Sequence, residues 1–385
     1  MMRPAARAVF ILLAVALNAL PWLQQASPRG AFLIAAPATA PPSGVASFRE
    51  DVINPESPHP MSHVGSITEL PDGTLAATWY AGSREGASDV GIYMSTKTPD
   101  SETWSPPRAI VTRETAQRDL NRPIKKVGNA VVFAGPDGRL WLVYVTVSVG
   151  GWSGSSLNVT LSSDRGRTWT PSRRLTVSPF FNLAELVKNT PVPLEGGGWA
   201  VPMHHEFVAR FAEVLWLHEQ DGEIRAAKTR ITGGRSHFQP ALVPLDQSRA
   251  VAILRDWSEA RVVSVSRTGD GGQTWSAPEP ADLPNPDAGV DAIRLEDGRL
   301  LLAFNDSLTG RGDLSLALSS DEGHTWQRVA TLEEEPEPAG DFSYPSLLLS
   351  RTGDVHLVYT WKRTAIKHAV FNTAWLDERR SQQPR

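Results

Sequence analysis

The side chains in this sequence that could carry chemistry stand where runs of apolar, strand-like residues begin or end. Arg255 closes one such run, and Arg311 precedes another. Planar guanidinium groups bind carboxylates through two parallel hydrogen bonds, so the many arginines of the chain could supply sites for an anion, although they could also reflect coding bias alone. Glu206 closes a third run and His63 opens a fourth, and both could transfer protons, His63 because imidazole titrates near neutral pH.

Composition limits the kinds of site that the chain can build. It has no cysteine, which excludes disulfides and thiolate zinc sites, and its net charge of -4 does not predict binding to nucleic acid. His204 and His205 are neighbours in a strand-like run, so their side chains should point to opposite faces rather than share a metal. We therefore expect no metal, no cofactor and no nucleic-acid partner.

An octapeptide of the form Ser/Thr-x-Asp-x-Gly-x-Thr-Trp recurs along the chain, and its residues suit a structural role. It occupies 162–169, 268–275 and 319–326, and a degenerate copy spans 96–104. The Asp can accept hydrogen bonds from backbone N–H groups, the Gly can take a positive φ, and the Trp can pack beneath. We predict that each copy closes a β-hairpin and takes no direct part in catalysis.

A second repeat is a tight turn between strand-like apolar runs. Such turns recur roughly every 50–65 residues, enough for one sheet of four short strands, and centre on Gly73, Gly138, Gly197, Asp246, Gly298 and Gly353. Six hairpins predict an all-β chain folded as a six-bladed β-propeller, with the octapeptides closing the outer turns of four blades. A β-sandwich or a series of smaller β-domains is the alternative, but the regular period favours the propeller. Beyond the N-terminal segment we find no convincing helical stretch, and 123–126 and 180–188 suggest long loops.

The N-terminus has the pattern of an export signal. Two arginines precede the apolar run Ala8–Leu20, and small residues at 35–40 could include a cleavage site, although the run could instead remain as a membrane anchor. We expect a periplasmic or secreted protein, a monomer, with possible inner-membrane anchoring. The expected organisation is a signal or anchor plus Pro/Ala-rich linker at 1–44, the propeller at 45–378 and a polar tail at 379–385.

The octapeptides, known as Asp boxes, and the hairpin series together resemble the sialidase (neuraminidase) superfamily, and specifically its bacterial BNR-repeat proteins. Segments that resemble this subgroup are Trp79-Tyr-Ala-Gly-Ser-Arg-Glu-Gly-Ala-Ser-Asp89, Phe238-Gln-Pro240, Asn285-Pro-Asp-Ala-Gly-Val-Asp291, Ser343-Tyr-Pro345 and Tyr359-Thr-Trp-Lys-Arg363 with Ile366-Lys-His368. The resemblance implies a site in the central depression, where three arginines bind a sugar carboxylate, a glutamate activates a tyrosine nucleophile and an aspartate serves as acid/base.

Residue by residue, the resemblance assigns these roles to positions of this chain. Tyr344 matches the nucleophile, although it could instead be a core residue, and Asp89 matches the acid/base, although it could instead cap a turn. The positions that match arginines or could face the pocket are Arg84, Arg255, Arg311, Arg363 and His368. Polar residues at comparable loop positions, expected to contact sugar hydroxyls, are Asn189, Asn285, Asp291 and Asn305.

Two positions depart from the family pattern. His63-Val-Gly65 stands where sialidases carry Arg-Ile-Pro, which removes one arginine of the clamp, and His63 could instead be a buried structural residue. Gln239 stands where the activating glutamate should lie, and an amide cannot accept a proton at any useful pH. Glu206 is a possible substitute base, unless it is an ordinary surface residue.

Three functions fit this pattern. The first is a sialidase-type exo-glycosidase that releases terminal sialic acid or a related acidic sugar from glycans. The second is a propeller glycosidase or lyase for another acidic sugar, in which His63 and Glu206 replace the usual pair. The third is an exported carbohydrate-binding propeller that has lost turnover. The partner expected in each case is a glycan or a small acidic sugar.

Overall fold

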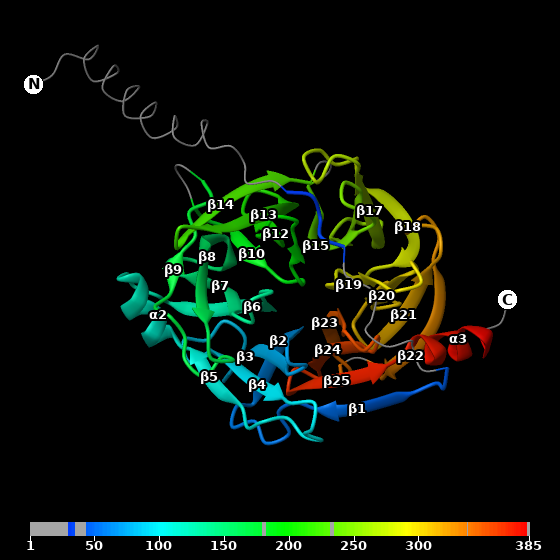
Figure 1. The fold of residues 1–385 in the computed structure, drawn as a ribbon, viewed down its shortest axis with the longest axis horizontal. Helices are drawn as coiled ribbons and strands as arrows, with labels where there is room; N and C mark the ends of the chain where they lie inside the picture. The colour runs from blue at the N-terminus through cyan, green and yellow to red at the C-terminus, as the bar shows by residue number, and fades with distance from the viewer. Residues whose placement is uncertain (1–29, 35–43, 179–181, 232–234, 337, 383–385) are drawn as a thin grey trace, which may run out of the picture.

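The computed structural model describes residues 30–34, 44–178, 182–231, 235–336 and 338–382, and six antiparallel sheets stand in a ring around one axis (Figure 1). Blade 1 consists of β2 (Met61–Glu69), β3 (Leu75–Gly82), β4 (Gly91–Lys97) and β5 (Arg108–Val111). Blade 2 consists of β6 (Lys126–Ala134), β7 (Leu140–Val147), β8 (Ser155–Ser162) and β9 (Arg173–Arg174). Blade 3 consists of β10 (Glu185–Val187), β11 (Val192–Pro193), β12 (Trp199–Glu206), β13 (Arg210–Gln220) and β14 (Glu223–Arg230).

The other three blades repeat this order from the axis outwards. Blade 4 consists of β15 (His237–Pro244), β16 (Ala250–Asp256), β17 (Val262–Thr268) and β18 (Glu279–Pro284). Blade 5 consists of β19 (Asp291–Arg294), β20 (Leu300–Phe304), β21 (Asp313–Ser319) and β22 (Gln327–Glu334). Blade 6 consists of β23 (Phe342–Leu349), β24 (Val355–Trp361), β25 (Ala365–Phe371) and β1 (Phe48–Val52). The predicted six-bladed β-propeller is thus confirmed.

The ring closes between the two ends of the described chain. Strand β1 pairs antiparallel with β25, from Phe48 opposite Phe371 to Val52 opposite Lys367, so the N-terminal strand is the outermost strand of the last blade (Figure 1). Blade 6 therefore needs no turn between its third and fourth strands. Blade 3 closes that turn with Asp221-Gly222, both at positive φ, so these two blades are the ones without an Asp box.

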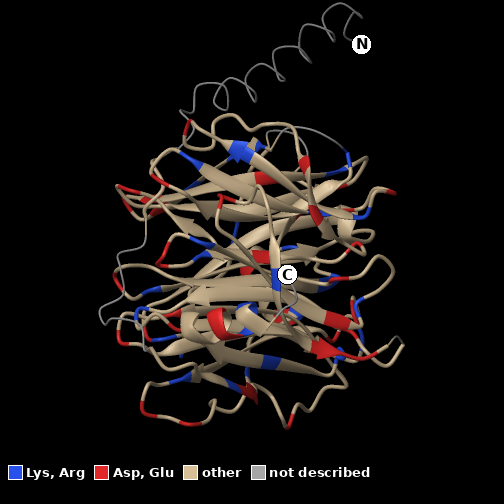
Figure 2. Cartoon of the chain, turned by 90° about the vertical axis from the view of Figure 1, so that its right-hand side faces the viewer, with Lys and Arg blue, Asp and Glu red and all other residues tan. Residues whose placement is uncertain are grey.

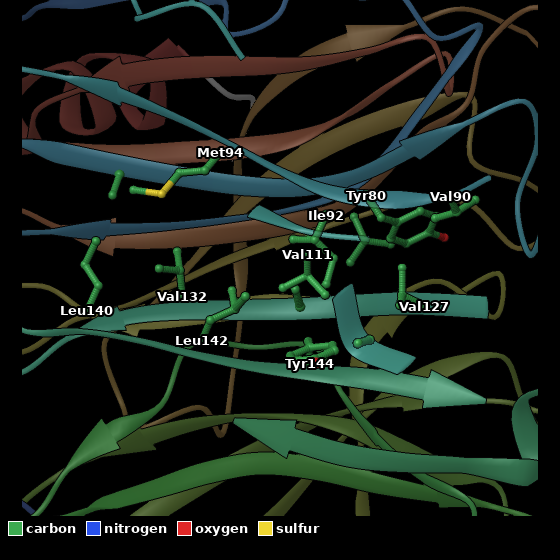
Figure 3. Close-up of a cluster of buried hydrophobic side chains, with 14 of the residues drawn as sticks. Tyr80, Val90, Ile92, Met94, Val111, Val127, Val132, Leu140, Leu142 and Tyr144 are labelled. Carbon is green, nitrogen blue, oxygen red and sulfur yellow. The ribbon is translucent and has the colours of Figure 1, made fainter. Parts of the chain in front are cut away.

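Buried apolar side chains form one cluster between each pair of neighbouring blades. Figure 3 shows the cluster between blades 1 and 2, where Ile92 and Met94 face Val132, Leu140 and Leu142. Both faces of a blade are covered in this way. Strands such as β3 and β7, the second in their blades, are therefore buried along their whole length. Charged residues of both signs are interspersed over the outside (Figure 2).

The Asp boxes are hairpin turns with the predicted chemistry. In the box at 268–275, the Asp270 carboxylate accepts from the backbone N–H and the hydroxyl of Thr274 at 2.9 and 2.6 Å. Gly272 has φ +78°, and Trp275 is buried with its Nε1 donating to Gly272 O at 3.2 Å. The boxes join the third and fourth strands of blades 1, 2, 4 and 5, so they lie on the ring face opposite the entry of the inner strands.

The prediction that no helix follows the N-terminal segment was wrong. Helix α2 (Arg113–Leu120) begins at a capping box in which Thr112 and Thr115 satisfy each other's backbone N–H groups. Helix α3 (Thr373–Gln382) packs Trp375 and Leu376 against blades 5 and 6 and extends into the predicted polar tail. The loop expected at 180–188 includes the short inner strand β10. The last residue of the loop expected at 123–126, Lys126, is the first residue of β6.

A short segment before the propeller is built into it. Phe32 is fully buried and stacks on Trp216 between blades 3 and 4, and its backbone N–H donates to Gln247 O at 2.9 Å. The predicted signal sequence and possible cleavage positions at 35–40 lie outside the described residues. Within the described part of the chain, no helix has the length and apolarity needed to cross a membrane.

Candidate active site

The site lies at the centre of the ring, where the inner strands enter. In blades 1, 4 and 6 the ladder of the inner strand is interrupted near its start by a β-bulge. Each bulge contains one residue at positive φ followed by a glycine or a proline. The residues at positive φ are Val64, Gln239 and Tyr344, with φ of +54°, +50° and +54°. Such backbone is unfavourable for a residue with a side chain, and it turns the chain locally at the site. Gln239 and Tyr344 meet beside Gly289. If Gly289 carried a Cβ, this atom would lie 3.1 Å from Gln239 Oε1 and 3.2 Å from Tyr344 Cδ1, so both side chains pack closely against the glycine.

Two arginines converge on Tyr344. Arg255 lies with Nη1 3.5 Å from Tyr344 Oη and 2.9 Å from Gln239 Oε1, while its Nε donates to Asp287 at 2.7 Å. The Arg311 guanidinium lies 5.2 Å from the centre of the Tyr344 ring and donates to the backbone oxygen of Asp287 at 2.9 Å. Burial raises the pKa of Tyr344, but Arg255 and Arg311 outweigh burial and hold this pKa below its ordinary value of 10.0.

His63 is fully buried on the other side of the tyrosine. Its ring stands edge-on to that of Tyr344, with ring centres 4.9 Å apart, and its Nδ1 lies 2.9 Å from the hydroxyl of Thr360. Among the described residues, its buried Nε2 has no hydrogen-bond partner. Burial and the nearby Arg363 lower the pKa of His63 well below 6.5, so the imidazole is neutral at physiological pH.

A chain of ion pairs lines the same rim between blades 1 and 6. Arg363 donates from Nε to Asp341 at 2.6 Å and from Nη1 to Glu85 at 2.9 Å. Burial raises the pKa of Asp341, but bonds from Ser343 and Arg363 lower it more, so Asp341 is ionised. Arg363 is therefore already paired with two carboxylates.

The structure holds Asp89 in a turn. Its carboxylate accepts from the backbone N–H and the hydroxyl of Ser83 at 3.0 and 2.9 Å, and these bonds lower its pKa. Asp89 and Arg84 are both exposed on the loop between β3 and β4. No hydrogen bond or ion pair described for Asp89 joins it to Tyr344, Arg255 or Arg311.

Glu206 lies at the end of β12 beside His204 and Arg210. Its Oε1 is 3.2 Å from His204 Nε2, and its Oε2 is 4.0 Å from Arg210 Nε. Burial raises the pKa of Glu206, but His204, Arg210 and Arg255 outweigh it, so the pKa is below its ordinary value and the group is ionised.

Several polar residues expected to contact sugar bind the protein backbone instead. Asn189 donates to Pro240 O at 2.8 Å, and the Asp291 carboxylate accepts from Leu347 N–H at 2.8 Å. The Asn285 side-chain amide donates to Ala288 O and accepts from Ala288 N–H, and Asn305 donates to Phe342 O. His368, which could have faced the pocket, is buried between β24 and β1, where it bonds to His356 and Asp51. The Oδ1 atoms of Asn189 and Asn305 are buried without a hydrogen-bond partner among the described residues.

Four residues of this region were not predicted as site residues. Asp287, Asp341 and Glu85 pair with the arginines, and Lys188 is buried below Tyr344. Asp287 and Glu85 stand within the segments that carry the family resemblance, which is the signal that could have identified them. Lys188 and Asp341 carry no local pattern.

A group that could hold a metal ion lies apart from Tyr344, on the face of blade 3 towards blade 2. Ligand atoms of Glu185, His205 and Glu213 lie within 4.8 Å of one another. The ammonium of Lys228 already binds both carboxylates, at 2.6 Å from Glu185 and 3.1 Å from Glu213. His204 faces Phe238 on the other side of the strand, as expected for neighbours in a strand.

The fold and the arginine–tyrosine site define a sialidase-like six-bladed propeller. The chain belongs to the BNR repeat-like domain family, whose match spans residues 73–357. The family resemblance predicted from the Asp boxes is thereby confirmed. No curated protein matches the chain by sequence.

Similar solved structures include sialidases. The Hadza microbial sialidase Hz136 is 18% identical with a TM-score of 0.67, and the match covers 80% of this chain but 65% of that one, so this chain spans under two thirds of its length. The intramolecular trans-sialidase from Ruminococcus gnavus, solved with oseltamivir carboxylate, is 13% identical with a TM-score of 0.66, covering 87% and 99%. A protein of unknown function from Dyadobacter fermentans is 14% identical with a TM-score of 0.66, covering 84% and 99%. At these identities the likeness concerns the fold alone.

Proposed function

We propose that this protein is a sialidase-type glycoside hydrolase that removes a terminal sialic acid or a related acidic sugar from glycans. The observation that carries the proposal is Tyr344, a partly buried phenol that Arg255 and Arg311 approach and whose pKa they hold down. A phenolate can attack an anomeric carbon that bears a carboxylate without bringing a second carboxylate close to it.

Binding would use the two arginines that face Tyr344. The described hydrogen bonds of Arg255 use Nε and Nη1, which leaves Nη2 for a substrate carboxylate. His63 stands in place of a third arginine and is neutral, so the clamp offers two charges where a sialidase offers three. We therefore expect weaker binding of the carboxylate than in a three-arginine site.

In the proposed first step, the Tyr344 oxygen bonds to the anomeric carbon while the glycosidic bond breaks and the leaving oxygen takes a proton from an acid. Gln239 cannot accept the phenolic proton, so this proton passes to solvent, and Arg255 and Arg311 favour the phenolate that remains. Asp89 is our candidate acid. Its bonds to Ser83 lower its pKa, so it must give up these bonds and take up a proton before it can protonate the leaving oxygen. Water then releases the sugar from the tyrosine.

The test is release of the fluorophore from a fluorogenic sialoside and from a fluorogenic glucuronide, compared among wild type, Tyr344→Phe and Asp89→Asn. We expect turnover of at least one glycoside by the wild type and about a hundredfold loss or more in Tyr344→Phe, because the nucleophile is removed. Equal turnover by wild type and Tyr344→Phe would overturn the proposal.

Gln239 favours a second candidate, an exported carbohydrate-binding propeller without turnover. Its amide stands where proton transfer needs a carboxylate and is held by Arg255 at 2.9 Å. Calorimetric titration with free acidic sugars separates the candidates. Binding that depends on Arg255 and Arg311, with no release from any glycoside, would assign the protein to this class.

We also propose that the protein acts outside the cytoplasm, because its N-terminal sequence has the pattern of an export signal. A cut within 35–40 would remove Phe32 from the interface of blades 3 and 4. We therefore expect any processing to occur before Gly30. The intact mass of the exported protein tests this, and a mature chain that begins after Ile34 would contradict it.

A further inference from the structure

Lys188 follows β10 at the centre of the ring and binds backbone atoms of two other blades. Its ammonium donates to Val290 O of blade 5 at 2.8 Å and to Pro345 O of blade 6 at 2.7 Å. The side chain is 2% exposed, although a lysine is almost never buried without a specific partner. A single side chain from blade 3 therefore crosses the axis to the residue that follows Tyr344.

Asp291, at the start of β19, binds the strand just beyond the same bulge. Its carboxylate accepts from Leu347 N–H at 2.8 Å, and it is also 2% exposed. The Lys188 amine thus binds the bulge at Pro345, and the Asp291 carboxylate binds the strand just beyond it at Leu347, each from a different blade. Burial lowers the pKa of Lys188 and raises that of Asp291, and the charge of each favours the ionised form of the other.

The Tyr344 backbone needs such support. Its φ of +54° is unfavourable for a tyrosine and persists only where the surroundings fix it. Gly289 lies beside Lys188 as well as Tyr344, and an added Cβ there would meet Lys188 Cε at 3.3 Å. The lysine stem thus packs directly under the floor of the site.

We propose that Lys188 and Asp291 are positioning residues that hold the Tyr344 bulge so that the phenol faces Arg255 and Arg311. The consequence for catalysis rests on the proposed function, but the position of the phenol can be measured without turnover. A purely structural pair would stabilise the ring and leave the ionisation of Tyr344 unchanged.

The experiment is a spectrophotometric titration of tyrosine in wild type, Lys188→Met and Asp291→Asn, with Tyr344→Phe to identify the signal. Lys126→Met is the matched control, because Lys126 is also buried but lies over the Trp152 ring in blade 2. We expect Lys188→Met to raise the pKa of Tyr344 by about one unit, since the phenol loses its alignment with charged donors. Lys126→Met should titrate as wild type.

Asp291→Asn keeps an oxygen for Leu347 N–H, so it should fold even if Lys188→Met does not. It removes the negative charge that favours the ammonium form of Lys188, so the bond to Pro345 O weakens and the Tyr344 signal should also shift upward. Wild-type ionisation of Tyr344 in a folded Lys188→Met or Asp291→Asn protein would overturn the proposal. Where a glycoside is turned over, kcat should fall in both variants with KM little changed. Failure of every glycoside assay would refute the proposed function and leave the titration result decisive for the positioning role.

Discussion

Tyr344 differs from the other tyrosines of the chain in the sign of its pKa shift. Burial raises the pKa of Tyr80, Tyr93, Tyr144 and Tyr359, whereas Arg255 and Arg311 bring that of Tyr344 below 10.0 despite its burial. A tyrosine that is merely part of the core would have a raised pKa, as the other four do. The two guanidiniums therefore make this phenol more acidic than an ordinary tyrosine, which is the direction of shift that favours a nucleophile.

We predict that one tyrosine of the wild-type protein ionises below pH 10 and that Arg255→Met raises its pKa by about one unit or more, because a nearby cation favours the phenolate. Arg311→Met should act in the same direction. The tyrosinate absorbance measures both. Arg84→Met is the control, since that arginine is exposed on a loop, and an equal shift in the control would refute the assignment.

Gln239 supplies the second prediction at this scale. Gln239→Glu places a carboxylate beside Arg255, which should keep it ionised and able to accept the Tyr344 proton. We expect hydrolysis of the preferred glycoside to increase about tenfold or more, within the range that general bases contribute. The kcat of the variant checks this, with Gln239→Asn as the uncharged control. No gain in Gln239→Glu would mean that the missing base does not limit turnover.

The hairpins and bulges are the elements that bring these residues together, and they differ in how far sequence reveals them. The six hairpins and four Asp boxes were predictable because their turn chemistry is local: Asp270, Gly272 and Thr274 interact within one turn. Helix α2 was missed because its signal is a single capping box at Thr112 in a short, mostly polar segment.

The site was only partly predictable for a related reason. Resemblance identified Tyr344, Arg255 and Arg311, which the fold brings together. Asp89 and Asp291, by contrast, bind Ser83 and Leu347, and the sequence did not identify either partner. The contacts of Lys188 cross from blade 3 to blades 5 and 6 and join residues more than a hundred positions apart. No local pattern encodes such a contact.

The Asp box of blade 4 allows two effects of replacing a glycine to be measured separately, the strain of a positive φ and the crowding of an added side chain. Gly271 and Gly272 have φ of +69° and +78°, but an added Cβ at Gly272 would lie 2.9 Å from the Trp216 ring, whereas the nearest atom to one at Gly271 is 3.9 Å away. We expect Gly271→Ala to cost about 1 kcal/mol of unfolding free energy and Gly272→Ala about 2–4 kcal/mol. Denaturant titration measures both, and equal costs would show that crowding against Trp216 is unimportant.

The whole molecule is closed at the interface between blades 6 and 1, which has the smallest apolar cluster of the six among the described residues. A polar row lies beside it. His356 Nδ1 is 3.0 Å from His368 Nε2, and His368 Nδ1 is 3.1 Å from Asp51, which also pairs with Lys97 of blade 1 at 2.9 Å. Ring closure thus depends on buried imidazoles as well as on apolar packing.

These imidazoles predict that the ring is weakened by acid. Burial, with His368, Arg49 and Lys97 nearby, lowers the pKa of His356 from 6.5 to about 3. The unfolded chain therefore takes up a proton below pH 6.5 that the folded chain does not bind until about pH 3, so stability falls across this interval as pH decreases. Asp51, with a folded pKa of about 2 against 3.8, contributes stability that is lost only at lower pH.

The measurement is the unfolding free energy of wild type and His356→Leu at pH 7.5 and pH 5.0. The variant loses the bond to His368, so it should be less stable at pH 7.5. The variant has no imidazole to protonate at this position. On acidification its unfolding free energy should therefore decrease less than that of wild type, by about 1.4 kcal/mol for each pH unit below 6.5. His63 and His205, whose pKa values are also lowered by burial, still titrate in both proteins and cancel in the comparison. If wild type and His356→Leu differ in unfolding free energy by the same amount at both pH values, His356 does not contribute to the acid sensitivity of the closed ring.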